Sequence, residues 1–405
     1  IMKIQGPTRL RRYLIIGLIL MLLPGVFENI TAQISFTKSS LDLNGQVSIT
    51  GVTSLMYGPD GRLYVAEYPP GTINVMTVVR NGASDYVVTA VEELSGVTDI
   101  VNHDDDGSVN SGQTQREVTG LTVAGTAANP VIYVTSSDFR IGSGPGGGSG
   151  DLGLDTNSGI ITRFTWNGSS WDVVDLVRGL PRSEENHATN GLEKTTINGT
   201  DYLIVASGGI TNAGAPSTNF VHTCEYALSG AVLSVNLDML NSMGIQTDGN
   251  GRQYIYDIPT LDDPTRANAN GITDPDMAGY NGIDVNDPWG GNDGLNQAMI
   301  VPGGPVQIFS PGYRNTYDLV VTQSGAVYVT ENGANGGWGG MSVNEGGGSA
   351  TNDYDPAELG SSSPTADGEQ VNNVDHLEMI TNDIQNYTFG SFYAGHPNPT
   401  RSNPN

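Results

Sequence analysis

The chain has 405 residues, of which 55 are glycine, 21 are proline and only 15% are charged. Its net charge is −26, because 17 basic residues stand against 43 acidic ones. Nucleic-acid-binding proteins need clustered Lys and Arg, and the sequence has no such cluster beyond its N-terminus, so we exclude a nucleic-acid partner. The acidic, loop-rich composition favours an extracellular protein that uses calcium, or one whose acidity simply keeps it soluble.

Residues 1–33 have the pattern of a secretory signal peptide. Arg9, Arg11 and Arg12 precede an apolar run from Tyr13 to Phe27, and small residues follow at Thr31-Ala32. Basic, apolar and small-residue regions in this order are typical of cleaved signals, and the apolar run is short for a membrane span. We therefore expect a protein secreted to the extracellular space or the periplasm, with no stable membrane insertion after cleavage. An uncleaved anchor is the alternative.

Short strands and turns follow in a repeated order over residues 34–405. The first unit has strands at 54–57 and 62–67 around the Asp60-Gly61 turn, and further strands at 72–79 and 86–92. Looser copies lie at 121–135 and 191–206. A fourth copy has strands at 318–322 and 326–330. Alternating β-branched and aromatic residues between turn residues predict antiparallel hairpins.

Regularly spaced four-stranded units predict an all-β fold, a β-propeller. The interval before the fourth unit is nearly doubled by the loop-rich segment 258–294, which is either an insertion or a degenerate blade. Because the last residues read as a loop, we expect the chain to lack its final blade or blades. Cys224 is the only cysteine, which excludes an intrachain disulfide. It lies in segment 219–227, which we predict to be a strand, as a small buried apolar residue.

Polar residues stand at equivalent places in the third and fourth units. His187 precedes the first strand of the third unit, and Arg314-Asn315 precedes that of the fourth. Glu331 to Asn335 follows the second strand of the fourth unit. Equivalent positions of successive blades converge on one face around the axis, so we expect these side chains to share a central pocket.

These same segments carry a family resemblance. The pattern LPR…NHATNGL…NAG, followed by GYRNTYDL…GAVYVTENGANGG, resembles the glucose/sorbosone dehydrogenase family. The resemblance implies a six-bladed propeller, and some members of the family bind pyrroloquinoline quinone (PQQ) and calcium. It extends over roughly Val52 to the C-terminus, with His187 and residues 314–335 as its specific parts.

The resemblance also implies roles for individual residues. His187 would be the general base that takes the proton of a sugar hydroxyl, as a neutral imidazole can. Arg314 and Asn315 would address the quinone, with Arg314 stabilising the charge that develops on it. The main-chain carbonyls of Gly333 and Ala334 would bind Ca²⁺. The implied function is a secreted sugar or alcohol dehydrogenase in which hydride passes from the hydroxyl-bearing carbon of the substrate to PQQ, and an external acceptor takes up the electrons.

Other interpretations of the same residues stay open. His187 could be a loop hydrogen-bonding residue, and Arg314 could form a structural ion pair with Asp318 or Glu331. The rival function is a non-catalytic extracellular propeller module that binds glycans or proteins. Two oxygen-rich loops, at 103–107 and 284–287, are weaker calcium candidates that equally suit solvated turns. Three aromatic residues, Tyr313, Trp289 and Trp338, could line a sugar platform or equally pack within the blades.

Overall fold

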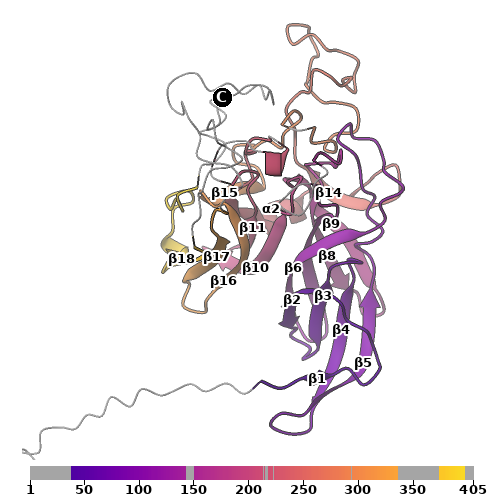
Figure 1. The fold of residues 1–405 in the computed structure, drawn as a ribbon, viewed down its shortest axis with the longest axis vertical. Coiled ribbons are helices and arrows are strands. Elements are labelled where there is room, and N and C mark those ends of the chain that lie inside the picture. Colours follow the sequence, from indigo (N-terminus) through magenta and orange to yellow (C-terminus); the bar gives the residue numbers. More distant parts are fainter. Residues whose placement is uncertain are drawn as a thin grey trace, which may run out of the picture.

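In the computed structural model the regular secondary structure of the described residues is almost entirely β-strand. The structure describes residues 38–142, 150–212, 214, 218–221, 223–292, 294–335 and 374–396. The predicted signal peptide therefore lies outside the described residues. Four sheets contain the named strands, and in each of them a meander of consecutive antiparallel strands forms the main part (Figure 1). The all-β prediction is confirmed.

The first two sheets form the first and second blades. The first has the order β1-β5-β4-β3-β2, with β1 Leu41–Asp42, β2 Val52–Tyr57, β3 Leu63–Glu67, β4 Ile73–Arg80 and β5 Tyr86–Leu94. The second has the order β13-β14-β9-β8-β7-β6, with β6 Arg116–Gly125, β7 Pro130–Asp138, β8 Gly159–Trp166, β9 Trp171–Leu180, β13 Gln246–Thr247 and β14 Gln253–Asp257. Strand β14 pairs with β9 in parallel and widens the second blade.

The third and fourth sheets complete the described fold. The third has the order β10-β11-β12-β15, with β10 Thr189–Ile197, β11 Thr200–Ser207, β12 Ala231–Asn236 and β15 Val306–Pro311. The fourth comprises β16 Asn315–Val321, β17 Val327–Asn332 and β18 His376–Thr381. The helices are short: η1 Thr218–Phe220, α2 Leu237–Ser242 and η3 Ile384–Asn386. No helix within the described ranges is both long enough and apolar enough to span a membrane.

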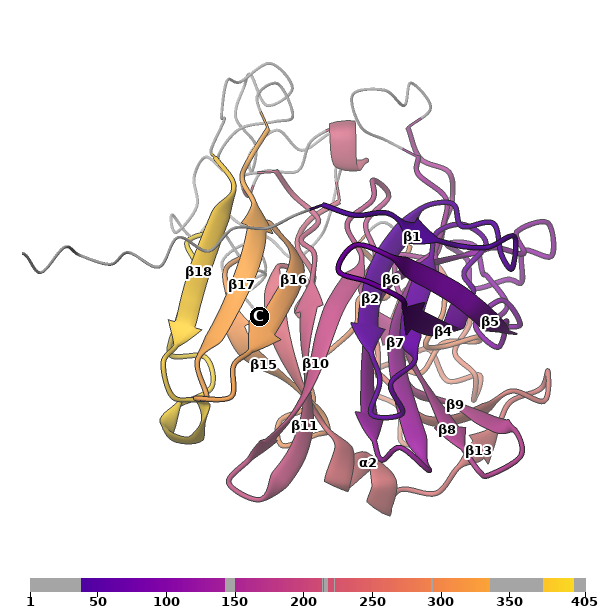
Figure 2. The same cartoon turned by 90° about the horizontal axis from the view of Figure 1, so that it is seen from below.

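The sheets stand side by side like the blades of a propeller (Figure 2). Their cores lie between neighbouring blades, because successive side chains of a strand point to opposite faces. In β11, Leu203 and Val205 pack toward the second blade, whereas Ile204 and Ala206 pack toward the fourth. A strand buried on both faces reads as a continuous apolar run, which explains the composition of the predicted strands.

The first strands of the blades, β2, β6, β10 and β16, meet at the hub. Each contains a register shift against its partner, at Thr53, Thr119, Asn190-Gly191 and Tyr317-Asp318. The extra residues reach the next blade. Thr53 donates to the carbonyl of Val118 at 2.7 Å, and Thr119 donates to that of Thr189 at 2.7 Å. β-bulges re-aim the backbone locally, and here they join blade to blade.

Two predictions about the connecting segments are resolved by the structure. Residues 219–227 are not a strand: η1 and a loop occupy this segment, because its carbonyl and amide groups pair locally rather than with a sheet. The same loop partly buries Cys224, and this burial raises the pKa of its thiol to about 12. The segment 258–294 contains no named strand among its described residues, only isolated bridges such as Asn268 with Asp284. It is an insertion, not a degenerate blade.

We predict that Gly120 is required for this close packing of the hub. A Cβ at Gly120 would collide with the carbonyl oxygen of Asn190 in the neighbouring blade. Gly120→Ala should therefore lower the free energy of unfolding by about 1–3 kcal/mol, as overpacking does. Urea denaturation measures this change. Gly244→Ala is the control, since nothing lies within 4 Å of a Cβ there. Equal effects of the two substitutions would contradict the close packing.

Candidate functional site

Three ionisable residues occupy equivalent positions just before the bulges of the second, third and fourth blades. The last paired residue before the bulge is Val118 in the second blade, Thr189 in the third and Thr316 in the fourth. Two residues earlier the chain carries Arg116, His187 and Arg314, respectively. From the sequence we predicted that His187 and Arg314 occupy equivalent positions in two blades. The strand register places Arg116 at the same position in another blade, which we did not predict.

His187 lies buried in the loop before β10, with 3% of its surface exposed. Its Nδ1 atom lies 2.8 Å from the carbonyl oxygen of Gly209, and its ring packs against Phe220 of η1 with the ring centroids 5.2 Å apart. A carbonyl oxygen can only accept, so Nδ1 is the donor and carries the proton. In the neutral ring, Nε2 is then a free base, and it faces the Glu185 carboxylate at 3.7 Å.

The surroundings of His187 favour its neutral form. Burial is the largest cause, and the positive charge of Arg314 adds to it, so the pKa of His187 lies well below its ordinary value. Burial also raises the pKa of Glu185. The site thus presents an uncharged imidazole with a defined tautomer, which is the form that a general base requires.

Arg314 is held by its backbone and by its side chain. Its N–H donates to Glu331 Oε1 at 2.6 Å, and its Nε donates to Asn212 Oδ1 at 3.0 Å. Burial lowers the pKa of Arg314, against the opposing charges of Glu185, Glu225 and Glu331. Arginine stays protonated in proteins, so the guanidinium supplies a fixed positive charge beside His187.

Gly209 joins the two residues. Its N–H donates to the Arg314 carbonyl at 2.6 Å, while its own carbonyl oxygen lies 2.8 Å from His187 Nδ1. The preceding Gly208 is just as confined, because a Cβ there would lie 2.8 Å from His187 Cβ and 2.7 Å from Asn315 Oδ1. Two glycines at the end of β11 thus allow the third and fourth blades to approach closely. The structure brings His187, Arg314 and Asn315 together, as we expected.

The other predicted residues lie next to this cluster. Asn315 accepts a hydrogen bond from Asn190 Nδ2 at 3.2 Å. Gly333 and Ala334 follow β17, and the Gly333 N–H donates to Asp375 at 3.2 Å. Asn335 binds both ends of the Asn212 amide, at 2.8 and 3.0 Å. Asn212 therefore connects the Arg314 guanidinium to the segment that carries Gly333 and Ala334.

Several partners of the cluster were missed or misjudged from the sequence. Arg116 has the same register as His187 and Arg314, but it turns into the second blade and donates to Asn102 and to the carbonyl of Ser158. His396, which the sequence patterns did not connect with this cluster, lies 3.1 Å from Glu225 Oε1. Burial alone would raise the pKa of Glu225, but the hydrogen bond and charge of His396 outweigh it and the pKa is lowered. Only the fold brings residues so distant in sequence into contact.

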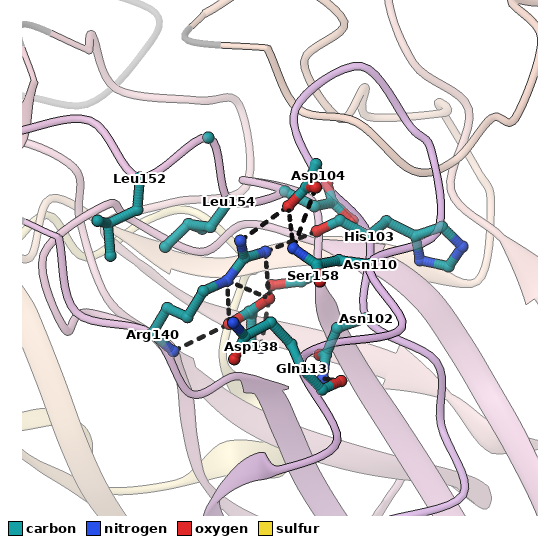
Figure 3. Close-up of polar contacts among 12 residues, drawn as sticks. Asn102, His103, Asp104, Asn110, Gln113, Asp138, Arg140, Leu152, Leu154 and Ser158 are labelled. Carbon is teal, nitrogen blue, oxygen red and sulfur yellow. Dashed lines mark hydrogen bonds and ion pairs between the residues drawn. The ribbon is translucent and has the colours of Figure 1, made fainter.

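The candidate calcium loop at 103–107 meets an arginine instead. Arg140 Nη1 lies 2.7 Å from Asp104 Oδ1, and Arg140 Nη2 lies 2.8 Å from Asp138 Oδ2 (Figure 3). Asn110 also donates to Asp104, at 2.9 Å. The guanidinium neutralises the carboxylates that a metal would need. In the part of the chain that the structure describes, no three His, Cys, Asp or Glu side chains form a group able to hold a metal ion.

Comparisons with known proteins find similarity at the level of solved structures only. No known family profile and no curated protein matches the chain. The carbohydrate-active enzyme of family AA12 from Trichoderma reesei matches with a TM-score of 0.38 at 12% identity, covering 82% of this chain and 52% of its own. The PQQ domain of pyranose dehydrogenase from Coprinopsis cinerea gives 0.35 and 12%, covering 71% of this chain and 45% of its own.

A third match is of the same kind. The PQQ-bound aldose sugar dehydrogenase from Streptomyces coelicolor gives a TM-score of 0.32 at 15% identity, covering 71% of this chain and 58% of its own. The chain thus spans about half the length of these three solved structures. Similarity at these scores carries no argument about chemistry, so the function below is argued from this chain's own residues.

We predict that the neutral state of His187 makes stability depend on pH. Below about pH 6.5 the unfolded chain protonates this imidazole, whereas the folded protein does not, because its pKa is lowered. The unfolded state then binds more protons. The free energy of unfolding therefore decreases as the pH is lowered, by at most about 1.4 kcal/mol per pH unit for one group. His187→Gln should make this decline shallower in denaturation series from neutral to mildly acidic pH. An unchanged slope would contradict the assignment.

Proposed function

We propose that the cluster around His187 and Arg314 oxidises a sugar or a related alcohol with the help of a PQQ-type quinone and Ca²⁺. The observation that carries the proposal is the double contact of Gly209, which fixes the imidazole tautomer and holds the backbone of Arg314, whose positive charge acts on His187. A neutral imidazole of defined tautomer can remove the proton of a substrate hydroxyl. A permanent positive charge beside it can stabilise the negative charge that develops as the substrate is oxidised.

Each residue has a separate role. His187 Nε2 takes the proton of the substrate hydroxyl, and the Glu185 carboxylate at 3.7 Å balances the charge of the protonated ring. Arg314 stabilises negative charge that develops during oxidation. Phe220 covers the imidazole and keeps water away from it. When bound, the quinone supplies the two-electron acceptor, which an external electron acceptor then reoxidises.

The residues of the cluster that would hold such a cofactor suit its chemistry. Arg314 and Asn315 would address its carbonyl groups. The carbonyl oxygens of Gly333 and Ala334 accept no hydrogen bond from any described residue, and Asp375 lies beside them. Oxygen donors of this kind suit Ca²⁺.

The charges around the site disfavour an anionic ligand that binds without a metal ion. Besides Arg314, Arg182 also lies near His187, but it faces the Glu117 carboxylate at 3.3 Å, and His396 lies 3.1 Å from Glu225. A quinone that carries several carboxylates therefore depends on the metal for compensation.

Reconstitution of the full-length protein with PQQ and Ca²⁺ tests the enzyme. Dye reduction should occur with at least one member of a panel of aldoses and polyols. His187→Gln should lower kcat by about 10²–10⁴-fold, as loss of a general base does, with quinone binding retained. His376→Gln is the matched control, because this histidine is exposed on β18. If no sugar is oxidised and no PQQ binds, the rival function, a non-catalytic glycan- or protein-binding module, is the better account.

We further predict that PQQ binding depends strictly on Ca²⁺. Because carboxylates surround Arg314, removal of the metal should abolish PQQ binding rather than weaken it slightly. Equilibrium dialysis with PQQ, with and without a chelator, measures this directly. Added Ca²⁺ should restore binding, and binding that is equally tight with the chelator present would contradict the charge argument.

We also propose export and a six-bladed ring. Export is supported by the signal pattern of residues 1–33, and the exported protein should begin close to residue 34 by N-terminal sequencing. The six-bladed ring is supported by apolar side chains exposed on the two outermost described blades, with Leu55 of β2 60% exposed and Leu377 of β18 71% exposed. A structure of the full-length protein in which these side chains stay in water would overturn the ring.

A further inference from the structure

A second site lies on the second blade, away from the hub. A cavity of about 320 Å³ opens between β9, the β13–β14 turn and the loop after β5. This volume is within the range of small-molecule sites, roughly 300–1,000 Å³. None of its lining residues belongs to the cluster around His187.

One wall of the cavity is aromatic. The imidazole of His103 stacks on Trp289, with the ring centroids 4.6 Å apart and the planes 8° from parallel. Figure 3 shows the His103 ring turned away from the contacts of Asp104 and Arg140. Neither ring nitrogen has a hydrogen-bond partner among the described residues. Burial lowers the pKa of His103 to about 4, with smaller contributions from Arg116 and Arg178, so the ring offers one donor and one acceptor at neutral pH.

The two guanidinium groups of the cavity are already paired. Arg178 donates through Nε and Nη2 to Asp257, at 2.6 and 2.9 Å, and through Nη1 to Asp248 at 2.9 Å. Arg252 donates through Nε and Nη2 to Asp175, at 2.9 and 2.6 Å, and through Nη1 to the carbonyl of Gly96. An anion would have to displace a carboxylate from either guanidinium. The cavity therefore does not select for anions.

The remaining groups suit hydroxyls. Asp99, Asn250 and Gln253 are exposed at the rim. Carboxylate oxygens accept from hydroxyl groups, while amides and the His103 ring can both donate and accept. A neutral sugar ring has an apolar face that can pack on an aromatic wall and hydroxyls that can bond to such groups. The cavity therefore suits a neutral sugar and not a charged ligand.

We propose that this cavity binds one neutral sugar unit of a glycan, with Trp289 and His103 as its platform and Asp99, Asn250 and Gln253 as its hydroxyl partners. It is a binding site separate from the hub, and its occupation requires neither PQQ nor oxidation. Such a site would hold the protein on a polysaccharide while the hub acts on another sugar.

Isothermal titration of the full-length protein, without PQQ, tests the proposal. The probes are cellohexaose, xylohexaose and maltohexaose, with hexagalacturonate as an anionic and a chitosan hexamer as a cationic counterpart. At least one neutral hexamer should bind more tightly than both charged ones. Trp289→Leu should weaken this binding about tenfold or more. Trp166→Leu is the matched control, because Trp166 is also partly buried in the second blade but does not line the cavity.

Further variants keep the test decisive if Trp289→Leu does not fold. His103→Phe preserves the stacked ring and removes both nitrogens, and Asp99→Ala alters an exposed rim residue; each should weaken binding severalfold. His187→Gln should leave glycan binding unchanged, which separates this site from the proposed enzyme. Absence of binding by all neutral hexamers, preference for a charged hexamer, or equal binding by Trp289→Leu and wild type would each overturn the proposal.

Discussion

The peptide group of Gly209 is the contact on which the candidate site depends. Its carbonyl oxygen fixes the tautomer of His187, and its N–H holds the backbone of Arg314. A side chain at this position would meet the Arg314 carbonyl at 2.6 Å and Glu225 Oε1 at 2.9 Å. Glycine is therefore required where the two blades meet, and the chemistry of the imidazole follows from a backbone constraint.

The hub is built on the same kind of close approach. The bulges in the first strands turn Thr53 and Thr119 toward the next blade, and Gly120 lets the strands come together. Burial then has two consequences for charge. It keeps His187 neutral, and it leaves the Arg314 guanidinium facing the opposing charges of Glu185, Glu225 and Glu331. The site is consequently balanced in charge before any ligand binds, which links quinone binding to the metal in the proposed function.

Much of the fold could be predicted from local patterns. The alternation in 62–67 and 326–330 located β3 and β17, because a strand's side chains alternate between faces. The juxtaposition of His187 and Arg314 was predicted from equivalent positions in two blades. The roles of these residues, and those of Asn315, Gly333 and Ala334, stay predictions.

Other features depend on contacts that no local pattern records. His396 binds Glu225 only because the last described segment returns to the hub. Arg116 shares the register of His187, yet its side chain is buried in the second blade, which depends on the positions of Asn102 and Ser158. The residues of 219–227 suggested a strand, but the described part of this segment forms η1 and a loop. Register can be predicted from sequence, whereas the direction of a buried charged side chain requires the fold.

The most direct test of the central claim is the titration of the His187 ring by NMR in wild type and in Arg314→Gln, with the signal assigned from His187→Gln. If the two residues share one site, removal of the positive charge should raise the pKa of His187, since Arg314 lowers it. Arg80→Gln, in the first blade, should leave the titration unchanged. The same His187 midpoint in wild type and in Arg314→Gln would contradict the account.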